Sequence, residues 1–313
     1  METTLAIDLG GTKILVGEVT KTGEILNSYT TPSKITEMDS VVKQICTAID
    51  TYMETYDFIG TVTNIGVGLV GRVNYHTGIW YEIHPELVGP IDMKTILEER
   101  YNIPTFIGND VFCATLAELN FGIGQQTKDF IYMNIGTGIA ARLVCDGKII
   151  TGHSYDAGEI GHTVANSASD VQCICGRKGC VEVLASGLGM HNRAIALLPE
   201  FPETSLQKPE NEQRISVKEL MAAYIQADAL AVKVVEEATT AVAETLMNLI
   251  RVADPAAIVL GGGVVNADVY FEKIKEKLHP KTIRFLEKGV TRTTLDVSHI
   301  ALLGASQLHL TKN

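Results

Sequence analysis

Basic residues are scarce in this chain, and long apolar runs are missing. Its 313 residues include 26 Lys and Arg against 37 Asp and Glu, a formal net charge of −11. No basic run stands out, so we expect neither a nucleic-acid partner nor a membrane-surface partner. No apolar stretch approaches the roughly 20 residues of a membrane-spanning helix, and the first residues lack the basic segment of a signal peptide. These absences favour an ordinary globular enzyme that acts on small molecules.

Cysteine is also rare, and its six positions fall into two groups. Cys46, Cys113 and Cys145 are scattered among apolar neighbours. We expect them to be buried free thiols, which fits a reducing, cytoplasmic location.

The other three cysteines lie in one short segment, Cys173-Ile-Cys-Gly-Arg-Lys-Gly-Cys180, with His162 upstream. Three thiolates and one imidazole form a complete tetrahedral Zn²⁺ site with no open position, so the metal would be structural. The alternative is a chance grouping of buried or disulfide-bonded cysteines, although Cys173 and Cys175 are too close to bridge easily. Glu159 and Glu182 flank these ligands, so the metal would hold two carboxylates in place.

A strand, glycine turn and strand pattern occurs twice, which indicates two related domains facing a nucleotide cleft. Asp8-Leu-Gly-Gly-Thr-Lys13 separates the first pair of strands, and Asn134-Ile-Gly-Thr-Gly138 separates the second pair. Because each turn joins two strands, it is neither a Walker loop nor a dinucleotide fingerprint, both of which precede a helix. Such a turn can wrap a phosphate, with Asp8 available to Mg²⁺ through water, or it can be an ordinary hairpin.

Asn109-Asp110 stands where a strand passes into a helix, the position at which open α/β sheets bind ligands. Asp110 can be a plain helix cap, or the pair can present a donor and an acceptor to a polyol. Farther on, Gly261-Gly262-Gly263 follows a buried strand and would let a flat ring or a phosphate approach the backbone.

The remaining pattern alternates strands with helices, which predicts the α/β class. Residues 74–90 are rich in aromatic side chains and are expected to form a loop. Strands are expected at 5–9, 14–19, 25–29, 64–70, 104–107, 130–135, 140–145, 149–150, 256–260 and, as an edge strand, 295–298; helices are expected at 38–56, 93–101, 111–120, 216–226, 229–253, 268–278 and 300–310.

With these motifs the chain resembles the ROK family of sugar kinases, within the actin-like ATPase superfamily. The resemblance spans essentially the whole length, and its most specific part is Gly158-Glu-Ile-Gly-His162 with the cysteine segment that follows. It implies two actin-like, ribonuclease H-like domains around a nucleotide and sugar cleft, each a mixed sheet flanked by helices. The domains would be residues 1–118, completed by a C-terminal helix at 300–313, and residues 119–299 with the zinc segment.

The resemblance also implies roles for individual residues. Asp110 would be the general base that activates a sugar hydroxyl. The other implied residues are Asn109, Glu159, His162, Glu182, Gly71 and Arg72 for the sugar; Asp8, Gly10, Gly11, Thr12, Lys13, Gly136, Thr137, Gly138, Gly261, Gly262 and Gly263 for the nucleotide; and His162, Cys173, Cys175 and Cys180 for Zn²⁺.

The implied reaction is phosphoryl transfer from ATP, with Mg²⁺, to glucose or a related hexose, in a homodimeric enzyme. An N-acetylmannosamine kinase, a fructokinase and a non-catalytic sugar sensor are the alternatives. Two segments depart from the family pattern. Ile83–Leu87 differs from the family pattern in a segment that would border the sugar. Ala140-Ala141-Arg142 stands where the family has further glycines, so that a side chain either narrows the nucleotide site or adds a cation there.

Overall fold

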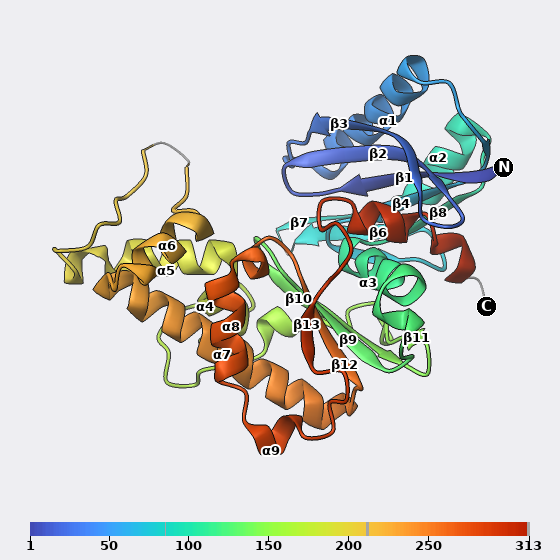
Figure 1. Ribbon diagram of the computed structural model, residues 1–313. Coiled ribbons are helices and arrows are strands. Elements are labelled where there is room, and N and C mark those ends of the chain that lie inside the picture. Colours follow the sequence, from blue (N-terminus) through green and yellow to red (C-terminus); the bar gives the residue numbers. More distant parts are fainter. Residues whose placement is uncertain (85, 211–212, 312–313) are drawn as a thin grey trace. The chain divides into compact units, whose positions relative to one another are not determined.

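The computed structural model describes residues 1–84, 86–210 and 213–311 (Figure 1). The chain forms two compact units. The first contains residues 1–126, 151–157 and 294–313, and the second contains residues 127–150 and 158–293. The sequence placed the first boundary between residues 118 and 119, a point inside the helix Asp110–Phe121. Pro85 and residues 312–313, which belong to two predicted segments, lie outside the described residues.

The first unit is built on a five-stranded sheet whose spatial order is β3-β2-β1-β4-β8. Strands β1, β2 and β3 pair antiparallel as a meander, whereas β1, β4 and β8 pair parallel. The central strand β1 is buried over most of its length, because apolar residues occupy both of its faces. The strands are β1 Glu2–Leu9, β2 Lys13–Thr20, β3 Ile25–Pro32, β4 Thr61–Leu69 and β8 Thr105–Asn109.

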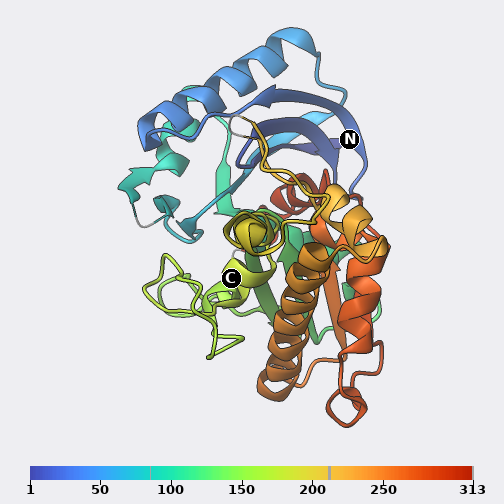
Figure 2. The same cartoon turned by 90° about the vertical axis from the view of Figure 1, so that its left-hand side faces the viewer.

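Helices cover this sheet through apolar stripes of helical spacing. In α1, Val41, Ile45, Ile49 and Tyr52 are buried, and the helix runs over strands β1 to β3 (Figure 2). The short helix α10 packs against α3, β1 and β4, so the C-terminal segment completes the first unit. The helices are α1 Met38–Thr55, α2 Met93–Tyr101, α3 Asp110–Phe121 and α10 Ile300–Ala305, with 3₁₀ turns η1 Ile123–Gln125 and η5 Leu308–Thr311.

The aromatic segment 74–90 is not a loop, and this prediction was wrong. It forms most of a second, three-stranded antiparallel sheet made of β5 Arg72–Asn74, β6 Ile79–His84 and β7 Leu87–Asp92. Trp80 is fully buried, and its indole N–H donates to the Val70 carbonyl at 3.0 Å.

A short segment, Thr151–Ala157, belongs to the first unit although the chain on both sides of it belongs to the second. Aromatic contacts hold it there. The Tyr75 ring stacks on Phe112 at 5.0 Å and meets the Tyr155 ring edge-on at 5.3 Å. The Tyr75 and Thr151 hydroxyls lie 3.3 Å apart.

The second unit has a five-stranded mixed sheet of order β11-β10-β9-β12-β13. Strands β9, β10 and β11 form an antiparallel meander, and β12 pairs parallel to both β9 and β13. The two units therefore repeat one arrangement, a meander whose first strand continues into parallel pairing. The strands are β9 Phe130–Ile135, β10 Ile139–Cys145, β11 Lys148–Ile149, β12 Ala257–Gly261 and β13 Val290–Arg292.

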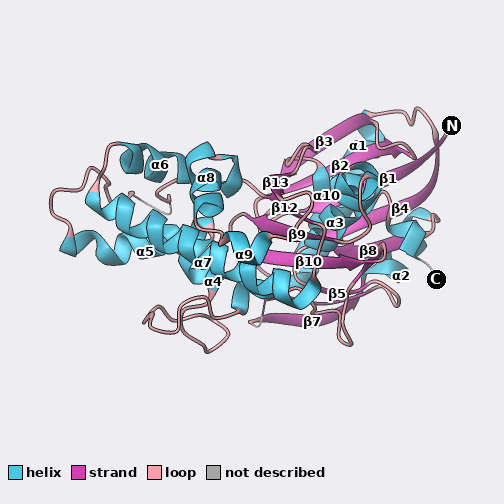
Figure 3. Ribbon diagram, turned by 60° about the horizontal axis from the view of Figure 1, so that its bottom comes forward, coloured by secondary structure: helices cyan, strands magenta, loops and turns pink. Residues whose placement is uncertain are grey.

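Helices α4 to α9 gather beside the strands of this unit (Figure 3). The longest, α7, has an apolar stripe that includes Val235, Val242 and Leu246, and it packs against its helical neighbours. Asp228 is its N-cap residue, and the Asp228 side chain accepts from the Ala231 N–H at 3.1 Å. The helices are α4 Val181–Ala185, α5 Gly187–Leu197, α6 Val217–Ile225, α7 Ala229–Ala253, α8 Asp268–Glu276 and α9 Pro280–Ile283, with 3₁₀ turns η2 Ile160–His162, η3 Leu198–Glu200 and η4 Val264–Asn266.

Three smaller predictions need correction. The edge strand of the second sheet is β13, and residues 295–298 form bends and turns. Of the three scattered cysteines, Cys113 is buried, Cys46 is half-buried and Cys145 is exposed. Among the described residues, no helix combines the length and the apolarity needed to cross a bilayer.

The contact between α10 and α3 generates a stability prediction. A Cβ atom at Gly304 would lie 1.5 Å from the Cys113 carbonyl oxygen, in the backbone of α3. Gly304→Ala should therefore lower the free energy of unfolding by about 2–3 kcal/mol, even though alanine favours a helix over glycine. Urea unfolding measures the loss. Gly89→Ala is the control, because a Cβ there meets nothing within 4 Å; equal effects of the two changes would contradict the close packing.

Candidate functional site

In the first unit, the predicted residues meet where the parallel strands end. Register pairs Leu9 with Leu69, and Leu69 with Asn109, so β1, β4 and β8 end at one edge. Asp8 and Gly71 lie beside this edge. Parallel pairing alone thus brings together groups that are separated by about a hundred residues in the sequence.

Asn109 and Asp110 occupy this edge as a hydrogen-bonded pair. The Asn109 side-chain N–H₂ donates to the Gly71 carbonyl at 2.9 Å and to Asp110 Oδ1 at 2.8 Å. Asn109, not Asp110, is the N-cap of α3, since its Oδ1 accepts from the Val111 and Phe112 N–H groups at 3.0 Å. Asp110 is the first helical residue, and its Oδ1 also accepts from the Val111 N–H at 2.9 Å. A fixed carboxylate at a helix N-terminus results.

Asp8 is a buried acidic group at this edge, and its electrostatic surroundings are unusual. Burial, followed by the negative charge of Asp110, raises its pKa to about 7, although Lys13 works in the opposite direction. The buried Cys113 thiol lies close to both carboxylates, and its pKa is raised well above the ordinary value by burial and then by Asp8 and Asp110. This concentration of negative charge favours a cation.

The Gly10-Gly11-Thr12 turn joins β1 to β2 and is closed by a Gly10 N–H bond to the Lys13 carbonyl at 2.9 Å. Neither glycine has a left-handed φ. A Cβ at Gly11 meets nothing within 4 Å, and one at Gly10 would only reach ordinary contact with Lys13 at 3.5 Å. The protein itself therefore gives no reason for glycine here, which favours the phosphate-binding alternative over an ordinary hairpin.

Gly71 and Arg72 also lie at this edge, and their surroundings are specific. Gly71 has a φ of 92°, and a Cβ there would lie 2.0 Å from the Glu82 carbonyl oxygen. The Arg72 guanidinium pairs with Glu82 at 3.2 Å and lies 5.0 Å from the Tyr81 ring. Arg72 is thus held by β6.

In the second unit, Glu182 lies against the Gly136-Thr137-Gly138 turn. Its Oε2 accepts from the Ile139 N–H at 2.9 Å, and a Cβ at Gly138 would lie 2.7 Å from the same oxygen. The start of α5 meets the turn as well, because the Gly187 N–H donates to the Gly136 carbonyl at 2.8 Å. Turn, carboxylate and helix N-terminus are therefore neighbours.

The predicted adenosine motif lies beside them. Gly262 has a φ of 88°, and a Cβ on it would lie 2.4 Å from the Ile135 carbonyl oxygen. At Gly263, by contrast, a Cβ would meet nothing within 4 Å. The end of β12 thus packs against the end of β9, and of the three glycines of this motif only Gly263 leaves open space beside the backbone.

Glu159 lies just before η2, and its carbonyl accepts from the His162 N–H at 3.2 Å. Its carboxylate lies 3.7 Å from the buried Arg142 guanidinium. Sequence reasoning considered Arg142 only with respect to the nucleotide and missed this pair. The opposite charges of Arg142 and Glu159 are compatible with a pair, but their spacing in the sequence does not indicate that they meet.

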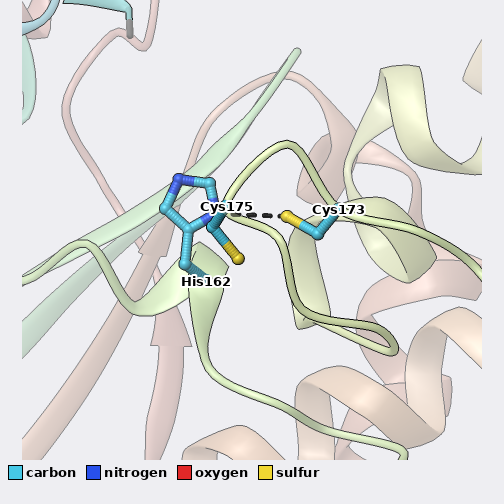
Figure 4. Close-up of side chains that lie close together, drawn as sticks. All are labelled: His162, Cys173 and Cys175. Carbon is cyan, nitrogen blue, oxygen red and sulfur yellow. Dashed lines mark hydrogen bonds between the residues drawn. The ribbon is translucent and has the colours of Figure 1, made fainter.

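Three of the four predicted metal ligands lie close together (Figure 4). His162, Cys173 and Cys175 have ligand atoms within 4.8 Å of one another. His162 Nδ1 lies 3.4 Å from Cys173 Sγ, and Cys175 Sγ lies 3.6 Å from Cys180 Sγ. Zn–S bonds of about 2.3 Å place two thiolates of a tetrahedron about 3.8 Å apart. The separation of Cys175 Sγ from Cys180 Sγ is close to this value, but Cys180 is not part of the three-residue group. The sulfurs are too far apart for a disulfide bond.

Local geometry explains how so short a segment brings its sulfurs together. The Cys173–Arg177 turn closes through the Cys173 N–H to the Arg177 carbonyl at 2.8 Å, with Gly176 at a φ of 86°. Burial, followed by hydrogen bonds that its thiol donates to Cys175 and Cys173, raises the pKa of Cys180 to about 12. Cys180 is the N-cap residue of α4, which carries Glu182 in its first turn.

Comparison with known proteins identifies the family of the chain. The sequence model of the ROK family matches residues 4–312. The chain belongs to the ROK family. ROK relatives include the glucokinase of Halalkalibacterium halodurans, 30% identical over 87% of this chain and 84% of that protein. The N-acetylmannosamine kinase of Citrobacter koseri is 26% identical over 97% and 98% of the two chains.

A solved ROK structure extends the likeness to the fold. The ROK glucokinase of Streptomyces griseus, in complex with glucose and AMPPNP, superposes with a TM-score of 0.79 at 26% identity and covers 98% of each chain. The predicted fold class, actin-like α/β units with mixed sheets flanked by helices, is confirmed.

The raised pKa of Asp8 predicts a pH dependence. Asp8 has a pKa of about 7 in the folded chain, whereas an aspartate in an unfolded chain has a pKa near 3.9. The free energy of unfolding therefore falls as the pH rises between those two values. Asp8→Asn should match the wild type near pH 4 and exceed its free energy of unfolding by up to about 4 kcal/mol above pH 7. Urea unfolding from pH 4 to 8, without nucleotide or metal, measures the difference. Asp57→Asn, in an exposed loop, is the control; a difference for Asp8→Asn that stays constant with pH would contradict the shift.

Proposed function

We propose that this ROK protein is an ATP-dependent hexose kinase that transfers the γ-phosphoryl group to a hydroxyl of glucose or a related hexose. The observation that carries the proposal is the fixed Asn109–Asp110 pair beside Asp8, at the edge where the Gly10–Lys13 turn begins. The kinase names of the relatives and the glucose and AMPPNP bound to the Streptomyces griseus enzyme support it.

Asp110 is the proposed general base. Its Oδ1 is oriented by the Val111 N–H and by Asn109, so the carboxylate is positioned to accept the proton of the attacking hydroxyl. Proton transfer of this kind contributes roughly 10²–10⁴ in rate. The remaining barrier to phosphoryl transfer is lowered by positioning and charge neutralisation.

The nucleotide groups are proposed from both units. Gly10, Gly11, Thr12 and Lys13, together with Gly136–Gly138, would hold the phosphates through backbone N–H groups, a hydroxyl and an ammonium. Gly261–Gly263 would accommodate the adenosine. Asp8 would hold Mg²⁺ through water, and that ion would neutralise charge on the β- and γ-phosphates.

The sugar hydroxyls would be bound by Asn109, Glu159, His162 and Glu182, with Gly71 and Arg72 nearby. His162, Cys173, Cys175 and Cys180 would hold Zn²⁺. With all four positions taken by protein, that ion would stabilise the segment and take no part in chemistry.

The identity of the hexose separates the alternatives. Relatives named for glucose and for N-acetylmannosamine both resemble this chain, and a fructokinase remains a third alternative. A sugar sensor without activity is disfavoured by the intact Asp110 and both turns. A homodimer in the cytoplasm is part of the proposal, on the family resemblance.

Asp110→Asn should keep the fold and lower kcat by about 10²–10⁴. The change keeps the size of the side chain and an oxygen that can accept from the Val111 N–H. Coupled ADP-release assays with glucose, mannose, fructose and N-acetylmannosamine measure it, and circular dichroism checks the fold. A variant that turns over at nearly the wild-type rate would rule out Asp110 as the base.

Cys175→Ser should release the metal and weaken sugar binding more than ATP binding. The reason is that the cysteine segment leads directly into α4 and Glu182, which is assigned to the sugar, whereas one of the two phosphate turns, Gly10–Lys13, belongs to the other unit. Metal content by mass spectrometry and separate titrations with sugar and nucleotide test this. Cys145→Ser, an exposed cysteine outside the cluster, is the control. Equal loss of both affinities would mean that the metal supports the whole fold.

A further inference from the structure

Arg142 is an unusual residue for the interior of a strand. It lies in β10, four residues after Gly138, and its side chain is only 4% exposed. A buried guanidinium is costly unless it is paired and hydrogen-bonded. Its Nη1 donates to the Ala141 carbonyl at 3.4 Å, and its Nη2 lies 3.7 Å from Glu159 Oε1.

Gly158 leaves the space that the guanidinium occupies. A Cβ at Gly158 would lie 2.4 Å from Arg142 Nη1 and 1.9 Å from the Ala141 carbonyl oxygen. The Ala141 N–H also donates to the Gly158 carbonyl at 2.9 Å, so this backbone is tied to β10. Both the strand and the glycine therefore fix the position of the cation.

Glu159 differs from Arg142 in exposure, with a side chain 40% exposed to solvent. A glutamate in that position normally loses side-chain freedom when it binds a ligand. The fixed Arg142 guanidinium already restricts the Glu159 side chain before a ligand binds, so less side-chain freedom is lost on binding. The carboxylate still faces solvent. Preorganisation of this kind increases affinity without adding a contact to the ligand.

We propose that Arg142 is a positioning residue that orients Glu159 for the sugar hydroxyls. The proposal rests on the proposed function, because Glu159 is assigned to the sugar there. Arg142 itself would touch neither the sugar nor the nucleotide.

The test compares Arg142→Met, which keeps much of the side-chain length, with Arg142→Lys, which keeps the charge. Arg142→Met should raise the KM for the hexose about tenfold, with the KM for ATP within about twofold and kcat changed less than the sugar KM. Arg142→Lys should recover part of the sugar affinity.

Arg193→Met is the matched control. Arg193 forms an ion pair with Glu237 at 2.9 Å in the same unit, between α5 and α7. Its loss should lower the melting temperature without raising the sugar KM. An Arg142→Met variant that resembles Arg193→Met in both measurements would show a merely structural role and overturn the proposal.

A double-mutant cycle with Glu159→Gln decides whether Arg142 acts through Glu159. If it does, Arg142→Met adds little to the sugar Kd in the Glu159→Gln background, measured by calorimetry; additive effects would overturn the proposal. If Arg142→Met folds poorly, Arg142→Lys replaces it in the cycle, and calorimetry measures the same sugar Kd values. A wild type that neither binds nor phosphorylates any hexose of the panel would overturn the proposed function as well, whereas an active wild type with additive effects would overturn only the role of Arg142.

Discussion

Parallel pairing of the inner strands is the constraint on which the arrangement of this protein depends. In the first unit it aligns the ends of β1, β4 and β8, so that Asp8 and Asn109 reach the same edge. In the second it aligns β9 with β12, and the glycine turns that follow both strands become neighbours. Parallel strands need long connections, and those connections are the helices that cover each sheet. The sheet topology therefore brings the candidate residues together, and local packing sets the orientation of their side chains.

Much of the fold follows from local signals. Helices α1 and α7 are marked by apolar spacing, and Asp92 and Asp228 are the N-cap residues of α2 and α7. The segment 74–90 was misjudged because its aromatic residues do not alternate cleanly, and its strands are short. Trp80 is buried by the tertiary contact with Val70, which no local pattern reveals. The strand expected at 295–298 failed for the same reason, since only pairing with β12 identifies β13 as the edge.

In the candidate site, too, residues that are close in sequence were predictable, whereas contacts between distant residues were not. Cysteine spacing predicted which residues converge because the ligands are close in sequence and glycines permit the turn. The roles of Asn109 and Asp110 at the helix start were less accessible, since either side chain can cap a helix and only the structure assigns the cap to Asn109. Arg142 and Glu159 were not paired at all. They are 17 residues apart, one in a strand and the other just before a 3₁₀ turn, and only the absence of a side chain at Gly158 lets them meet.

Two carboxylates near the cysteine segment are held by different means. Glu182 accepts from the Ile139 backbone N–H and lies in the first turn of α4, which directly follows Cys180, so its position depends on the cysteine segment and on the glycine turn. Glu159 lies before the His162 turn, but its carboxylate is oriented by a guanidinium that is buried in β10. A backbone N–H is fixed by the fold, whereas a guanidinium depends on its own packing and on the absence of a Cβ at Gly158. The orientation of Glu159 is therefore the more easily altered of the two, by changes in either β10 or the turn that precedes it.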